Sequence, residues 1–171
     1  MEGTYRTADK NIETSSLYGT VHGISSDYRN AGMPDLIVKI TPEDIETERE
    51  QTPAYADDYL DILAVYRKIA EAMPEWGTVL MHGSAIAVDD EAYLFAAPSG
   101  TGKSTHAGLW RRFWGDHTVM ANDDKPLFYL SEESIIVFGT PWNVEHHLGE
   151  NISAPLRAVC LFERGTENTI I

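Results

Sequence analysis

A glycine-rich segment in the second half of the chain has the residue types that bind phosphate. It reads Ala-Pro-Ser-Gly-Thr-Gly-Lys-Ser from Ala97 to Ser104, which fits the P-loop pattern with alanine in place of the first glycine. Gly100 and Gly102 let successive backbone N–H groups point at phosphate oxygens. In this pattern Lys103 reaches the β- and γ-phosphates and the Ser104 hydroxyl binds Mg²⁺. The segment therefore predicts a site for a nucleoside triphosphate such as ATP, together with Mg²⁺.

Two adjacent carboxylates, Asp123 and Asp124, follow the apolar strand that we predict at residues 118–121. We expect this strand to lie beside the strand that precedes the glycine-rich loop, so that its end points at the phosphates. One carboxylate would then face the Mg²⁺ and the other the incoming nucleophile. The alternative is a local one, in which the segment is an Asx turn that closes a hairpin into Pro126.

Short strands and one helix must position these groups. Apolar runs predict strands at residues 78–81, 84–88, 92–97, 118–121, 126–130, 135–138 and 156–162. Asp89-Asp90-Glu91 is short enough to join two of them as a hairpin. A helix is predicted from Ser104 to Trp114, with Gly115 at its C-terminus. Many strands and few helices indicate an α/β fold that tends toward α+β, with a mixed sheet.

The first part of the chain has a different pattern. One strand is predicted at residues 35–40, and Thr41 and Pro42 are typical of a helix N-cap and first helical position. Apolar residues spaced by three and four predict an amphipathic helix over residues 55–73 that packs against a sheet, with Asp61 among the residues of its polar face. We therefore divide the chain into an accessory region, residues 1–76, and a nucleotide-binding kinase-like domain, residues 77–171.

Composition excludes several classes of protein. The chain has 171 residues, 43% of them hydrophobic, and a formal net charge of −14. This negative charge repels phosphate backbones and anionic membranes, so we expect neither nucleic acid nor a membrane as a partner. No apolar run approaches the roughly 18 residues of a membrane span, and the N-terminus has no apolar signal core. Cys160 is the only cysteine, which excludes an internal disulfide. We expect a soluble, cytoplasmic protein.

The order of the motifs resembles that of the catalytic domain of bacterial HPr kinase/phosphorylase, which is related in fold to the core of phosphoenolpyruvate carboxykinase. The shared order is His82-Gly-Ser-Ala, a hairpin, the glycine-rich loop, one helix, one strand and the double aspartate. The resemblance covers about residues 77–165. It implies a mixed-sheet P-loop kinase that transfers the γ-phosphoryl group of ATP to a serine or threonine hydroxyl of a protein or peptide.

The resemblance also implies roles for individual residues. Lys103, Ser104 and Thr105 would handle ATP and Mg²⁺, within a nucleotide contact set of Pro98, Ser99, Gly100, Thr101, Gly102, Lys103, Ser104 and Thr105. One of Asp123 and Asp124 would deprotonate the acceptor hydroxyl, and the other, which we take to be Asp124, would hold the metal with Ser104. His82 would lie near the transferred phosphate. From the residues alone, His82 is equally a hydrogen-bonded turn residue.

The sequence also departs from this family. It has no clear match to the segment by which HPr kinase binds its protein partner, and His106 stands where the family has an acidic residue. The chain ends soon after the last predicted strand, so we expect a fragment of a longer catalytic domain.

The alternative function is a non-catalytic or regulatory nucleotide sensor. A transporter-type ATPase is excluded because no Leu-Ser-Gly-Gly-Gln signature occurs. The oligomeric state is not predicted.

A few other residues have side chains that could take part in chemistry. In the segment 139–147, Trp142 either stacks on a ligand, with Asn143 or His147 bonding to it, or is simply packed in the protein. Glu145-His146-His147 has poor spacing for a metal. Arg157 opens the last predicted strand and is a candidate for neutralising phosphate charge, whereas Arg111 and Arg112 are expected at a solvated surface. Cys160 is expected to be a small core residue.

Overall fold

The computed structural model describes residues 1–142 and 148–167. Its helices are α1 (Thr20–Ile24), α2 (Pro42–Gln51), α3 (Asp57–Ala72) and α4 (Lys103–Trp114). Its strands are β1 (Glu2–Thr7), β2 (Lys10–Ser15), β3 (Leu36–Lys39), β4 (Thr78–Leu80), β5 (Ser84–Val88), β6 (Glu91–Ala96), β7 (Thr118–Asn122), β8 (Leu127–Leu130), β9 (Ile135–Phe138) and β10 (Ser153–Leu161). The mixed α/β class predicted from sequence is confirmed.

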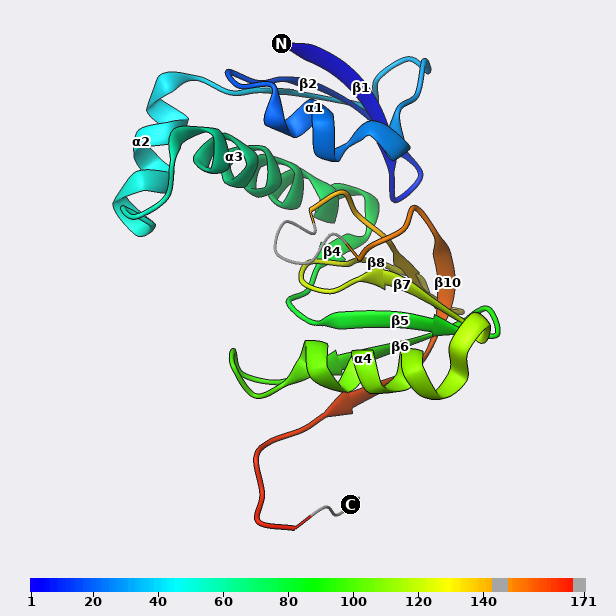
Figure 1. Cartoon of the computed structure of the whole chain (residues 1–171). Coiled ribbons are helices and arrows are strands. Elements are labelled where there is room, and N and C mark those ends of the chain that lie inside the picture. Colours follow the sequence, from blue (N-terminus) through cyan, green and yellow to red (C-terminus); the bar gives the residue numbers. More distant parts are fainter. Residues whose placement is uncertain (143–147, 168–171) are drawn as a thin grey trace.

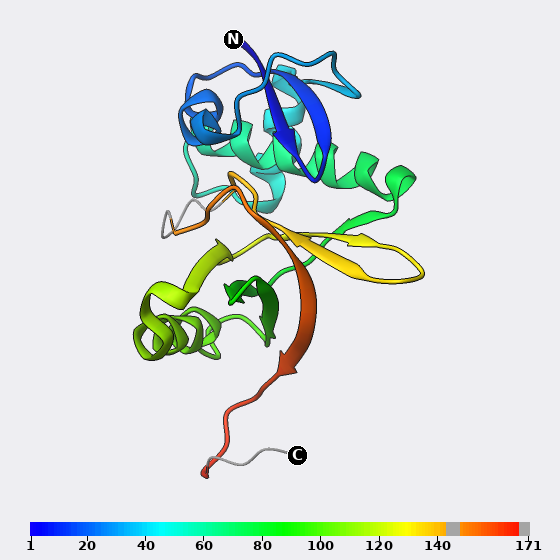
Figure 2. The same ribbon diagram turned by 90° about the vertical axis from the view of Figure 1, so that its right-hand side faces the viewer.

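The strands form two mixed sheets. The small sheet has the order β1-β2-β3, and the large one has the order β4-β8-β9-β10-β6-β5-β7. Helix α3 lies between the two sheets, and α4 lies against β5, β6 and β7 (Figure 1). The large sheet is curled, and β10 follows a long arc along it (Figure 2).

The small sheet was only partly predicted. Its third strand, β3, matches the strand expected at residues 35–40, but the β1–β2 hairpin was missed. The turn of this hairpin consists of Ala8 and Asp9, both with positive φ angles, 46° and 59°. Such turns usually contain glycine, which has no Cβ atom and is not disfavoured at positive φ, often next to an asparagine or aspartate. The expected turn signal is therefore absent from the sequence.

Helix α2 begins with the capping arrangement that the sequence predicts. The Thr41 N–H donates to Asp44 Oδ2 over 2.9 Å, the Thr41 side chain accepts from the N–H of Asp44, and Pro42 follows in the first turn. Lys68 of α3 donates to the same carboxylate oxygen over 2.7 Å. Burial alone would raise the pKa of Asp44, but the hydrogen bonds from Lys68 and Thr41 outweigh it and lower this pKa to about 2.

This lowered pKa predicts an acid-labile contribution to stability. A carboxyl group with a lower pKa in the folded state stabilises the fold above its unfolded pKa of about 4 and loses that contribution as the pH falls. Asp44→Asn should therefore lower the free energy of unfolding at pH 7 and flatten its fall between about pH 4.5 and pH 2.5. Urea denaturation at several pH values measures both effects, with the exposed Glu132→Gln as control. An unchanged pH slope in Asp44→Asn would contradict the assignment.

Helix α3 forms at the predicted place, with one correction to its polar face. Asp61, expected on the solvated side, is fully buried, and its carboxylate accepts hydrogen bonds from the N–H groups of Leu17 (3.1 Å) and Tyr18 (3.2 Å). Burial raises the pKa of Asp61 even though these two donors lower it. A charge pattern alone misses such a residue because its partners come from a distant part of the backbone.

The large sheet agrees with the predicted strands but not with one predicted neighbour. Strand β7 does not lie beside β6, because β5 is antiparallel to both and separates them. β6 and β7 therefore run in the same direction, and their C-terminal ends, with the start of β5, lie at one edge of the sheet. The C-terminal ends of β6 and β7 therefore lie at the same end of the sheet, as expected, but β5 separates the two strands.

The two regions of the chain share a hydrophobic core. One buried cluster joins residues of the N-terminal region, among them Ile12, Leu60 and Tyr66, to Leu127 and Trp142. The predicted domain boundary between residues 76 and 77 falls after the last strand of the small sheet and before the first strand of the large sheet. The division of the chain into two domains stays a prediction. Within the described residues, no helix has both the length and the apolar character needed to cross a membrane.

Candidate functional site

The glycine-rich loop, Ala97–Ser104, connects the end of β6 to the start of α4. Gly100 and Gly102 have φ angles of 74° and 114°, so both adopt a backbone conformation that residues with a Cβ atom disfavour. A Cβ atom at either position would meet no described atom within 4 Å, so the backbone conformation, rather than crowding, requires glycine. Thr101 N–H closes a turn onto the Pro98 carbonyl over 3.2 Å.

Lys103 occupies the first turn of α4 inside this loop. Its side chain is buried, and its Nζ donates to the carbonyl of Ala97 over 3.1 Å. The first N–H groups of a helix have no partner within that helix, and they carry its positive dipole end. The loop thus brings together an ammonium group, helix N–H groups and the hydroxyl-bearing residues Ser104 and Thr105, which is a suitable set for binding an anion.

An aromatic cluster fixes α4 against the sheet. The ring of Trp110 lies 5.1 Å from that of Tyr93 and 5.1 Å from that of Phe95. The His106 ring lies 4.7 Å from that of Phe95 and 5.4 Å from that of Phe162. His106, noted in the sequence as a departure from the kinase pattern, therefore packs with aromatic side chains of the sheet.

Arg164 is a loop contact that sequence reasoning missed. Its Nη2 donates to the Gly100 carbonyl over 2.6 Å, which places a guanidinium group against the glycine-rich loop. Arg157, proposed from sequence for phosphate neutralisation, is instead paired with Glu91 at 3.7 Å. Glu91 opens β6, at the end opposite the loop, so that proposal for Arg157 is wrong.

Asp123 lies at the edge of the sheet where the strand ends converge. It directly follows β7, and its side chain accepts a hydrogen bond from the Ser84 hydroxyl at the start of β5. Ser84 is fully buried and Asp123 is 7% exposed. This bond holds the Asp123 carboxylate at the start of β5. Strand β5 is the direct neighbour of β6, which leads into the glycine-rich loop.

Asp124 has a more open environment and two basic neighbours. Lys125 Nζ donates to Asp124 Oδ2 over 2.9 Å, and His82 Nε2 lies 3.5 Å from Asp124 Oδ1. His82 is exposed, whereas the side chains of Asp124 and Lys125 are each 30% exposed. The structure therefore places His82 in contact with Asp124, while its expected position near a transferred phosphate stays a prediction.

An Asx turn holds the two aspartates in place. Asn122 Oδ1 accepts from the N–H of Asp124 (2.7 Å) and from that of Lys125 (2.6 Å). The buried Asn122 amide donates in turn to the Thr140 carbonyl and hydroxyl. The Asx turn that the sequence left as an alternative is therefore present. It closes no β7–β8 hairpin, since these strands are not neighbours in the sheet.

The Asp124 carboxylate and the Ser104 hydroxyl suit a magnesium ion that also binds phosphate and water, but they do not suit a metal held by protein side chains alone. Among the described residues, no group of three histidine, cysteine, aspartate or glutamate side chains could hold a metal. Mg²⁺ usually takes only one or two carboxylates from the protein and completes its shell with phosphate oxygens and water. The Asp124 carboxylate and the Ser104 hydroxyl are donors of this kind.

The remaining sequence candidates have structural or surface positions. Trp142 is buried in the core, with its ring 4.9 Å from that of Tyr66, so it is packed and does not offer a face to a ligand. Arg111 and Arg112 are exposed, as expected, and Cys160 packs partly buried beside the α4 cluster. Asn143, Glu145, His146 and His147 lie outside the described residues.

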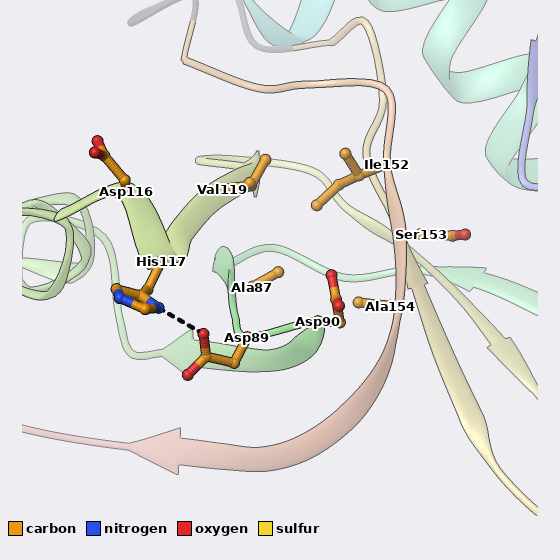
Figure 3. A pocket seen from close by; sticks show the side chains of 9 residues that line it. All are labelled: Ala87, Asp89, Asp90, Asp116, His117, Val119, Ile152, Ser153 and Ala154. Atoms are coloured by element: carbon orange, nitrogen blue, oxygen red, sulfur yellow. Dashed lines mark hydrogen bonds and ion pairs between the residues drawn. The ribbon is translucent and has the colours of Figure 1, made fainter. Parts of the chain in front are cut away.

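A pocket of about 330 Å³ lies at the other end of the sheet, where β5 ends and β7 begins. Figure 3 shows its lining, with His117 Nδ1 paired to Asp89 Oδ1 at 2.8 Å. Asp89 and Asp90 form the β5–β6 turn at positive φ, as the predicted hairpin requires. This pocket is separate from the glycine-rich loop, because the loop follows the C-terminal end of β6.

Comparison of the sequence with protein-family models and with curated proteins gives no match.

Proposed function

We propose that the chain is an ATP-dependent, P-loop kinase of the HPr kinase type that phosphorylates a serine or threonine hydroxyl of a protein or peptide. The observation that carries this proposal is the shared edge of the large sheet. There the glycine-rich loop follows β6, while Asp123 and Asp124 follow β7, which runs in the same direction. A phosphate-binding loop and two carboxylates at the same end of a sheet, here one strand apart, are the groups that phosphoryl transfer uses.

Each residue has a role in this proposal. Lys103 and the N–H groups of the loop would bind the triphosphate, and Ser104 with Asp124 would hold Mg²⁺, which would neutralise the phosphate charge. The acceptor oxygen attacks the γ-phosphorus, the bond from this phosphorus to the β,γ-bridging oxygen breaks, and ADP leaves. The buried Asp123 accepts the hydroxyl proton late in this step, and Ser84 fixes the direction of its carboxylate. His82 lies 3.5 Å from Asp124, and in this proposal it would face the transferred phosphate.

The direct test is incubation of the protein with γ-³²P-labelled ATP and Mg²⁺ in the presence of serine- and threonine-containing peptide pools. We expect label to appear on peptide hydroxyls as an alkali-labile, acid-stable phosphate ester. Binding of ATP without transfer or hydrolysis would overturn the kinase proposal and favour a nucleotide sensor.

Arg164 supplies a further prediction. Its guanidinium group lies on the loop that would hold the phosphates, so Arg164→Ala should weaken Mg-ATP binding about tenfold, the scale of one charge-assisted hydrogen bond near the surface. Arg157→Ala is a matched control, because it removes an arginine that pairs with Glu91 at the other end of β6. Equilibrium dialysis with labelled ATP measures both affinities. Equal affinities for the two variants would contradict a role for Arg164.

A further inference from the structure

Lys125 is a basic residue that the proposed mechanism does not use, although it is bonded to one of its carboxylates. Its Nζ lies 2.9 Å from Asp124 Oδ2, while His82 approaches the other oxygen at 3.5 Å. Both oxygens of the proposed metal ligand therefore face basic groups of the chain itself. The ammonium group occupies one lone pair of Oδ2, and its positive charge opposes that of a metal ion on the same carboxylate, so it competes with Mg²⁺ for Asp124.

The backbone of Lys125 is held from two sides. Its N–H donates to Asn122 Oδ1 over 2.6 Å, and its carbonyl accepts from the Thr140 hydroxyl over 3.0 Å. Asn122 and Thr140 are themselves buried and bonded to each other. The starting point of the lysine side chain is consequently fixed, and its ammonium group reaches Asp124 from a rigid turn.

Helix α3 of the N-terminal region supplies the surface on which this ammonium group rests. Lys125 Nζ lies 5.6 Å from the centre of the Tyr66 ring, within the range of a cation–π contact. Tyr66 is 5% exposed, and its hydroxyl has no hydrogen-bond partner among the described residues. Burial raises the pKa of this hydroxyl, and the negative charge of Asp124 adds to the effect. The ring is therefore a neutral, fixed wall beside the Lys125–Asp124 pair.

We propose that Lys125 is an internal counter-ion that competes with Mg²⁺ for Asp124, and that Tyr66 is the positioning residue that keeps it there. This inference rests on the proposed function, since it assigns Asp124 to the metal. Without metal, the ammonium group neutralises Asp124 and keeps it ordered. With Mg-nucleotide bound, Asp124 would hold the metal in place of the ammonium group, and Lys125 would remain beside the Tyr66 ring, facing the site. The N-terminal region thereby sets how much Mg²⁺ the site requires.

The test is the Mg²⁺ concentration that half-saturates ATP binding, measured by titration calorimetry at a series of Mg²⁺ concentrations. Lys125→Met should lower this concentration about threefold to tenfold, because it removes a competitor whose pairing is partly exposed. Lys125→Arg keeps the charge and should stay close to the wild type. Lys39→Met is the matched control, since it removes an exposed lysine from β3, in the small sheet.

Variants of Tyr66 separate positioning from packing. Tyr66→Leu should shift the Mg²⁺ requirement in the same direction as Lys125→Met, whereas Tyr66→Phe keeps the ring and should not. Tyr66→Leu should have no further effect in a Lys125→Met background, because the group that it positions is then missing. Thermal unfolding of each variant verifies that the fold is intact.

The possible outcomes are distinguishable. An unchanged or increased Mg²⁺ requirement in folded Lys125→Met, with normal ATP binding, overturns the counter-ion inference and leaves the proposed function standing. An absence of ATP binding in the wild type at every Mg²⁺ concentration overturns the proposed function and this inference with it.

Discussion

Asp123→Asn should reduce phosphoryl transfer by about a thousandfold and leave Mg-ATP binding within about threefold of the wild type. The substitution preserves the shape of the side chain, so the Ser84 hydroxyl still has an oxygen to bond to. It removes the charge and the proton-accepting oxygen. Because Asp123 is nearly buried, water does not readily replace the missing base.

Single-turnover transfer of labelled phosphate to a peptide acceptor measures the first quantity, and equilibrium dialysis the second. Asp90→Asn is a suitable control, because Asp90 is an exposed residue of the β5–β6 turn at the opposite end of the strands. Full transfer activity in Asp123→Asn would exclude Asp123 as the base. A nucleotide sensor would give a different result. The wild type would bind ATP without transferring phosphate, and Asp123→Asn would keep its cellular function.

Lys103→Met should weaken Mg-ATP binding about a hundredfold or more, because it removes a buried cation from the centre of the loop. The Lys103 ammonium group is bonded to the Ala97 carbonyl, inside the turn formed by the glycine-rich loop. Methionine is of similar length and fills the same space without charge. The loss is therefore electrostatic rather than a consequence of a collapsed loop.

Displacement of a fluorescent ATP analogue measures this affinity, and circular dichroism verifies the fold. Lys39→Met serves again as the control for the loss of one positive charge from a chain whose net charge is −14. Equal ATP affinity in Lys103→Met and Lys39→Met would show that the loop does not bind the triphosphate through Lys103.

The sequence predicted those parts of the structure that depend on neighbouring residues. The glycine-rich loop, its flanking strand and helix, and the capping of α2 all follow from patterns within about ten residues. The hairpin between β5 and β6 was predicted for the same reason, although its turn consists of Asp89 and Asp90 alone, because Glu91 already belongs to β6. The position of the aspartates after a strand could be predicted, because an apolar run that ends in polar residues marks the end of that strand.

The sequence did not predict contacts that the tertiary fold creates. The insertion of β5 between β6 and β7 depends on sheet order, which short-range patterns do not encode. Arg164 reaches the glycine-rich loop only because β10 is parallel to β6 and leads toward the same end of the sheet. Tyr66 appeared as one of several apolar positions on an amphipathic helix. Its contact with Lys125 arises because α3 packs between the two sheets.

The central claim is that the edge of the large sheet formed by the glycine-rich loop and the twin aspartates binds a magnesium–triphosphate complex. Titration calorimetry of Mg-ATP into the folded protein tests it most directly, with Mg-AMP as the comparison ligand. The account predicts saturable heat at one site per chain for Mg-ATP and much weaker binding of Mg-AMP, which lacks the β- and γ-phosphates that Lys103 is proposed to contact. No heat with Mg-ATP or Mg-GTP, or equal affinity for Mg-ATP and Mg-AMP, would contradict it.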